Sequence, residues 1–141
     1  ILGSAGEERE DLLRQYGLNV GMAFQLVDDV LDLTSNELTL GKPVGSDLKE
    51  GKLTLPLIYL MHDGKPQHRD LVREVLRSNS LDAANRDMIA QLVREYHTAD
   101  RVLDKARDYA QKAKDCLKDF PACDARTALL SIPEYIVERD R

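Results

Sequence analysis

The chain has 141 residues, of which 43% are hydrophobic and 32% are charged, and its formal net charge at pH 7 is −5. This length suits one helical domain over residues 1–141, and the acidic balance argues against a nucleic-acid binder, which carries a basic surplus. The longest strongly apolar stretch, residues 53–61, is too short to span a bilayer, so we predict no transmembrane segment. Cys116 and Cys123 do not make a disulfide framework, and as reduced thiols they predict a cytoplasmic protein.

Helical periodicity begins near the start of the chain. Residues 7–33 carry apolar side chains at helical spacing, with Gly17 as a possible kink or boundary. Residues 34–53 are rich in turn formers, which predicts a loop. Thr54 is then positioned to cap a helix that ends near Met61.

The second half of the chain is also helical in pattern. Periodicity predicts helices over residues 68–78, 82–96 and 99–119. Asp124 is expected to cap a final helix to about Arg139, interrupted or kinked near Pro133. Because no stretch alternates with period two, the predicted fold class is all-α.

One segment of the first helix carries acidic residues on a single stripe. At about 100° per residue, five positions fall within a wedge of roughly 100°. They are Gly21, Gln25, Asp28, Asp29 and Asp32, and every other position from Val20 to Leu33 is apolar. The helix should therefore be mostly buried, with one polar stripe that has no basic residue.

Two interpretations of this stripe are open. A solvated stripe would usually mix charge signs and favour Glu or Lys over Asp, which is a poor helix former. Three carboxylates within two turns repel one another, and a bound cation would relieve this repulsion. Oxygen ligands without His or Cys favour magnesium (Mg2+) over zinc, so the stripe is a candidate magnesium site.

The loop that follows contains glycines and lysines. Residues 40–56 read Leu-Gly-Lys-Pro-Val-Gly-Ser-Asp-Leu-Lys-Glu-Gly-Lys-Leu-Thr-Leu-Pro. The glycines allow close backbone approach, and Lys42, Lys49 and Lys52 supply point charges. Basic residues on a glycine-rich loop beside a magnesium site suggest a phosphate or diphosphate ligand.

These two segments resemble a known family, the trans-isoprenyl (polyprenyl) diphosphate synthases. Residues 24–32, Phe-Gln-x-x-Asp-Asp-x-x-Asp, resemble its second aspartate-rich motif. Residues 41–47, Gly-Lys-Pro-x-Gly-x-Asp, and 50–56, Glu-Gly-Lys-x-Thr-x-Pro, look like the segment that follows it. The resemblance is specific between residues 20 and 60 and closer to the medium- and long-chain branch.

The resemblance implies a fold, a reaction and partners. The fold would be the C-terminal helices of the isoprenoid synthase helical bundle. In that family, facing aspartate-rich helices bind magnesium on an allylic prenyl diphosphate, whose diphosphate leaves. Isopentenyl diphosphate then attacks head to tail, and a proton is lost. The expected partners are these two diphosphates, and either a second copy in a homodimer or the upstream half of the enzyme.

The same resemblance implies roles for the acidic residues. Asp28 and Asp32 would be metal ligands, and Asp29 would be a supporting carboxylate. Asp47 is a candidate for the outer shell of the metal site.

Four further residues would contact substrate. Gln25, Lys42 and Lys52 would bind the allylic diphosphate, and the two lysines would act catalytically by stabilising charge on the leaving group. Phe24 would line the hydrophobic tunnel or, as an alternative, pack in the core.

The family's first aspartate-rich motif has no match in this chain. The acidic run at residues 7–11 lacks its spacing, and the chain begins with Ile1. We therefore expect the C-terminal part of a larger polyprenyl synthase domain, inactive in isolation. A class I terpene cyclase is disfavoured because its second metal motif usually mixes Asn, Ser or Thr with Glu. A non-catalytic regulatory subunit is disfavoured because such subunits often lose these aspartates.

Overall fold

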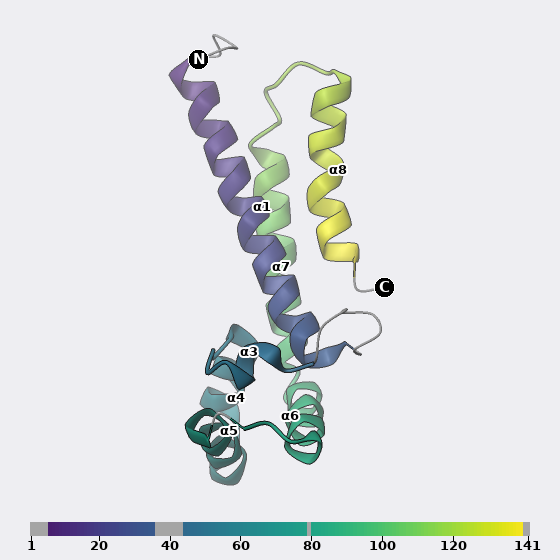
Figure 1. Cartoon of the computed structure of the whole chain (residues 1–141). Helices are drawn as coiled ribbons and strands as arrows, with labels where there is room; N and C mark the ends of the chain where they lie inside the picture. Colours follow the sequence, from purple (N-terminus) through teal and green to yellow (C-terminus); the bar gives the residue numbers. More distant parts are fainter. Residues whose placement is uncertain (1–5, 36–43, 79, 140–141) are drawn as a thin grey trace. The chain divides into compact units, whose positions relative to one another are not determined.

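The computed structural model describes residues 6–35, 44–78 and 80–139, where every regular element is an α-helix (Figure 1). This confirms the all-α prediction. The helices are α1 (Glu7–Thr34), α3 (Ser46–Lys49), α4 (Leu55–Asp63), α5 (Pro66–Ser78), α6 (Ala83–Glu95), α7 (Thr98–Asp115) and α8 (Asp124–Glu138). Within the described ranges, no helix combines the length and apolarity that a bilayer crossing requires.

Helix α1 runs through Gly17 without interruption, so the predicted boundary there is wrong. The alternative of a kink at Gly17 stays a prediction. A glycine in a helix interior costs only about 1 kcal/mol relative to alanine. The apolar pattern continues on both sides of Gly17, and packing of that face outweighs the local cost.

The predicted loop over residues 34–53 contains a short helix, α3, which periodicity did not indicate. Four residues are too few to show a helical repeat. The turn forms because Leu48 is almost completely buried and holds this segment against its neighbours. Gly51, with φ of 79°, then reverses the chain in a conformation that favours glycine.

The last two helices differ from expectation at their ends. Helix α7 stops at Asp115 because the following N–H groups of Leu117 and Lys118 bond three residues back, which tightens the chain into turns. Cys123, not Asp124, is the residue before the first turn of α8. Pro133 lies inside a continuous α8, so the predicted interruption is absent.

The described chain divides into two compact units. The first contains the chain up to Val27 and from Asp104 onward. Its buried cluster is formed by Tyr16, Ala113, Cys116 and Leu117, and the Tyr16 hydroxyl donates to the Leu129 carbonyl at 2.7 Å. Within this unit, α1, α7 and α8 therefore share one core. The prediction of a single domain over the whole chain stays a prediction.

The second unit, Asp28–Leu103, contains α3 to α6, which pack against one another. Its fully buried side chains include Leu48, Leu57, Leu60, Val72, Val75, Ile89 and Val93.

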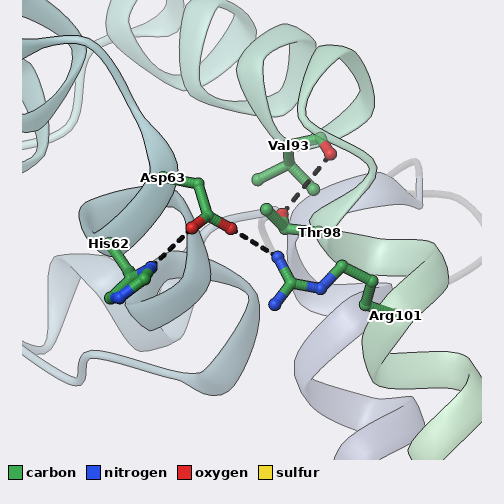
Figure 2. Close-up of polar contacts among 5 residues, drawn as sticks. All are labelled: His62, Asp63, Val93, Thr98 and Arg101. Carbon is green, nitrogen blue, oxygen red and sulfur yellow. Dashed lines mark hydrogen bonds and ion pairs between the residues drawn. The ribbon is translucent and has the colours of Figure 1, made fainter.

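Polar contacts within the second unit connect α7 to the helices before it (Figure 2). Arg101 donates to Asp63 at the end of α4, and Asp63 also contacts His62 Nδ1. The buried Thr98 hydroxyl donates to the Val93 carbonyl of α6 at 3.4 Å. These contacts hold the first turn of α7 against the ends of α4 and α6.

Candidate functional site

The last two turns of α1 carry the three aspartates of the predicted metal site. Asp29 is 8% exposed and Asp32 is 1% exposed, whereas Asp28 is partly exposed. The apolar positions between and around them are buried: Leu26, Val27, Val30, Leu31 and Leu33. Burying a carboxylate is unfavourable unless hydrogen bonds or a cation compensate its charge. This end of α1 therefore holds negative charge that requires partners.

Asp32 accepts two hydrogen bonds from the segment after α1. The Asp47 N–H donates to Asp32 Oδ2 at 3.2 Å, and the Gly45 N–H donates to the Asp32 carbonyl at 2.7 Å. Gly45 has a φ of 78°, a left-handed conformation in which glycine avoids the strain of a Cβ atom. This turn returns the chain to the end of α1 and places α3 beside Asp32.

The Lys52 ammonium forms ion pairs with two carboxylates of its own segment. Its Nζ lies 2.8 Å from Glu50 Oε2 and 3.1 Å from Asp47 Oδ1. Hydrogen bonds to Glu50, and then to Asp47, raise the pKa of Lys52 above its ordinary value, so the group stays charged at neutral pH. Because both side chains of the Lys52–Glu50 pair are more than half exposed, that pair is weak enough for an incoming anion to compete.

Asp47 is the residue that connects these two groups. Its backbone N–H donates to the Asp32 carboxylate, while its side chain accepts from Lys52. Its carbonyl also accepts from the Lys52 N–H at 2.8 Å. Asp47 thus forms hydrogen bonds with both a candidate metal ligand and a candidate phosphate-binding cation.

The structure describes only some of the other residues that were predicted to contact substrate. Phe24 is 44% exposed, so it does not belong to the buried core of its unit, and the Arg139 guanidinium lies 4.9 Å from its ring centroid. Gln25 is exposed on α1. Lys42 lies outside the described residues.

The aspartate stripe provides part of a metal site. In the part of the chain that the structure describes, no three His, Cys, Asp or Glu side chains converge as a complete ligand group. The stripe nevertheless offers only carboxylate oxygens, which hard divalent cations prefer. Magnesium is commonly held by one or two carboxylates together with waters and substrate phosphates. Asp28 and Asp32 fit such a partial set.

Two contacts at this site were missed by sequence reasoning. One is the role of Glu50 as a partner of Lys52, and the other is the use of the Asp47 backbone, not its side chain, to reach Asp32. The close alternation of acidic and basic residues over 47–52 could have indicated the first. Nothing local indicated the second, because it depends on how the turn folds back.

Comparison with protein families gives one match over most of the chain. Residues 1–96 match the family described as polyprenyl synthetase.

Individual relatives agree with this match. The chain is 39% identical over 140 residues to the octaprenyl diphosphate synthase of Haemophilus influenzae, covering 99% of this chain and 42% of that protein. It is 37% identical over 145 residues to the octaprenyl diphosphate synthase of Escherichia coli, covering 100% of this chain and 43% of that protein. This chain therefore spans less than half the length of these relatives.

A solved structure also matches. The fold superposes on a polyprenyl synthase from Caulobacter crescentus, determined in complex with calcium and isoprenyl diphosphate, with a TM-score of 0.87. The match has 37% sequence identity and covers 98% of this chain and 42% of that one.

Proposed function

This chain belongs to the polyprenyl synthetase family, and we propose that it contributes the second aspartate-rich half of a magnesium-dependent prenyltransferase site. The reaction would join isopentenyl diphosphate to an allylic prenyl diphosphate. The C–O bond of the allylic diphosphate breaks, and diphosphate departs with the electron pair. The double bond of isopentenyl diphosphate forms the new C–C bond, and a proton leaves the adjacent carbon.

The observation that carries this proposal is the connection of Asp32 to Lys52 through Asp47. A departing diphosphate gathers negative charge, and preorganised cations stabilise that charge most effectively. The chemistry that magnesium supplies when bound is electrostatic stabilisation of the diphosphate oxygens. Because Asp47 contacts both residues, the metal-binding end of α1 and the Lys52 ammonium would keep a fixed position relative to each other.

Each residue of the chain has a distinct part in this proposal. Asp28 and Asp32 would hold the metal, with Asp29 as a supporting carboxylate. Lys52 would exchange its ion pair with Glu50 for the diphosphate oxygens, because that pair is exposed and weak.

Three residues would complete the substrate contacts. Lys42 and Gln25 would bind the same diphosphate, and the half-exposed Phe24 would line the apolar path of the growing chain.

The exposed apolar face of α1 supports a partner for this chain. Leu18 is 65% exposed and Met22 is 44% exposed, and residues four apart lie on the same side of a helix. We propose that the upstream half of the enzyme covers this face, with assembly into a homodimer. We further propose that the enzyme acts in the cytoplasm.

Reconstitution of the two halves tests the proposal. The 141-residue chain is incubated with isopentenyl diphosphate, an allylic diphosphate and magnesium, with and without the upstream half. Product is expected only when both halves are present, because one carboxylate cluster leaves the departing charge facing water. The control uses the double substitution Asp28→Ala and Asp32→Ala in the reconstituted pair, which should abolish turnover. Turnover by the 141-residue chain alone would refute the proposed division of the site.

A further inference from the structure

The turn that reaches Asp32 is in contact with the connection between α5 and α6. Gly45 is the residue before the first turn of α3, and a Cβ atom at Gly45 would lie 2.6 Å from Leu81 Cδ2. Real Cβ atoms essentially never approach another atom this closely. Arg86 Cγ is 3.9 Å from the same point, an ordinary van der Waals distance. A methyl group of Leu81 therefore occupies the space that a side chain at position 45 would need.

The start of α6 holds Leu81 in this place. The next residue, Asp82, caps α6, and its Oδ1 accepts a hydrogen bond from the Asn85 N–H at 2.7 Å. Such a cap satisfies a backbone donor at the helix end and stabilises the first turn. Leu81 itself is partly buried. Its side chain thus extends from an ordered helix end onto the backbone of Gly45.

Gly45 connects this contact to Asp32 through three backbone hydrogen bonds. Its carbonyl accepts from the Lys49 N–H at 3.0 Å, which makes Gly45 part of the α3 turn. Its N–H donates to the Asp32 carbonyl at 2.7 Å, and the Asp47 N–H donates to Asp32 Oδ2 at 3.2 Å. The latter distance is at the upper end of the normal range. A small displacement of Gly45 and α3 would therefore break the hydrogen bond to the Asp32 carboxylate.

We propose that Leu81 is a positioning residue for the Asp32 carboxylate, acting through the turn at Gly45. Leu81 keeps Gly45 and α3 close to the end of α1, and it acts without contacting metal or substrate. Removing a packed side chain leaves a space into which its neighbours shift only in part, so the turn would lose its restraint. The consequence for magnesium rests on the proposed function, in which Asp32 is a metal ligand. The connection from Leu81 to Asp32 does not rest on it.

Hydrogen exchange of the metal-free 141-residue chain in EDTA tests this connection. Leu81→Ala should speed exchange at the Gly45 and Asp47 amides by about tenfold, because the turn opens more often without its packing. Leu81→Met keeps most of the side-chain volume and should retain the native rates. Leu71→Ala is the matched control. Leu71 is also partly buried and lies on α5 in the same unit, but the atoms nearest to a Gly45 Cβ belong to Leu81 and Arg86.

Gly45→Ala tests whether the contact with Leu81 is direct. In the native chain the new methyl group meets Leu81, and the alanine must also adopt a φ of 78°, which is unfavourable for it. In a Leu81→Ala background only the unfavourable φ remains. Gly45→Ala should therefore speed exchange at the Asp47 amide by a smaller factor in that background. Equal factors in the two backgrounds would show that the residues act independently and would overturn the proposal.

Magnesium titration followed by NMR extends the test to the metal. Leu81→Ala should weaken magnesium affinity by about threefold to tenfold, less than the loss of a direct partner of a metal ligand. Leu81→Met should retain the native affinity, and so should Leu71→Ala.

Three results decide between the outcomes. Native exchange rates at Gly45 and Asp47 in a folded Leu81→Ala variant would overturn the proposal. Faster exchange with native magnesium affinity would also overturn it, because the turn would then not control the carboxylate. A native chain without any magnesium response would contradict the proposed function, whereas the exchange rates would still decide the role of Leu81.

Discussion

The backbone N–H of Asp47 donates a hydrogen bond to Oδ2 of Asp32, 15 positions earlier in the chain, at 3.2 Å. The Asp47 side chain is directed to Lys52, so the two functions of this residue are separate. A substitution of the side chain removes one of them and leaves the other. The metal-binding part and the diphosphate-binding part of the candidate site can therefore be tested separately.

Magnesium binding should be visible at both ends of this hydrogen bond. Titration of the 141-residue chain with magnesium is expected to shift the amide signals of residues 25–32 and also that of Asp47, more strongly with added diphosphate. Zinc should show no special preference, since the stripe has no nitrogen or sulfur ligand. Asp28→Asn should weaken the shifts, and the exposed Asp11→Asn serves as its control. Shifts confined to other residues would contradict the assignment.

Lys52 should matter for catalysis far more than Lys49. In the complete enzyme, Lys52→Ala should lower kcat by up to about 10²- to 10³-fold, the usual effect of losing one preorganised contact to developing charge. Lys42→Ala should act in the same direction. Lys49→Ala is the matched control, because it removes the same charge from the same turn outside the motif. Steady-state kinetics measure the effect. Equal turnover rates for the Lys42, Lys49 and Lys52 variants would exclude the role of the loop.

Asp47→Ala should separate metal binding from diphosphate binding. The alanine variant keeps the backbone N–H that reaches Asp32, so magnesium-induced shifts at residues 25–32 should persist. It loses the carboxylate that holds Lys52, so the affinity for diphosphate in the presence of magnesium should change. A loss of the magnesium response in a folded Asp47→Ala variant would show that the side chain, not the backbone, supports the metal site.

Asp63 should make stability depend on pH in the acidic range. Hydrogen bonds from His62 and then Arg101 hold the pKa of Asp63 below its ordinary value. A carboxyl with a lowered pKa in the folded state stabilises the fold above its unfolded pKa of about 3.9, and this contribution is lost as pH falls through the folded pKa.

Urea unfolding of the native chain and Asp63→Asn between pH 7 and pH 2 measures this effect. The native chain should be the more stable at neutral pH, and the difference should shrink below about pH 4. In an Arg101→Gln background the Asp63→Asn substitution should cost less, because one partner is already missing. A difference that stays constant with pH would contradict the ionic origin of the contact.

Tyr16→Phe should destabilise the first unit by about 1 kcal/mol. The substitution removes the hydroxyl that donates to the Leu129 carbonyl but keeps the buried ring. Tyr135→Phe is the matched control, because Tyr135 is 70% exposed. Thermal unfolding followed by circular dichroism compares the two, and equal melting temperatures would show that the hydroxyl contact contributes nothing.

The sequence by itself determined the fold class, the family and the acidic stripe on α1. Apolar spacing extends over enough residues to define most helices, and the aspartate spacing is a local property of one helix. Local patterns misplaced several features, and packing decided two of them. Helix α1 continues through Gly17 and α8 through Pro133, because the buried faces on either side outweigh the local preference.

Only the tertiary structure decided how the site is connected. The pairing of Asp47 with Asp32 depends on a left-handed turn at Gly45. This contact joins residues 15 positions apart in the chain, so its formation depends on the summed burial of several helices, which no local pattern expresses.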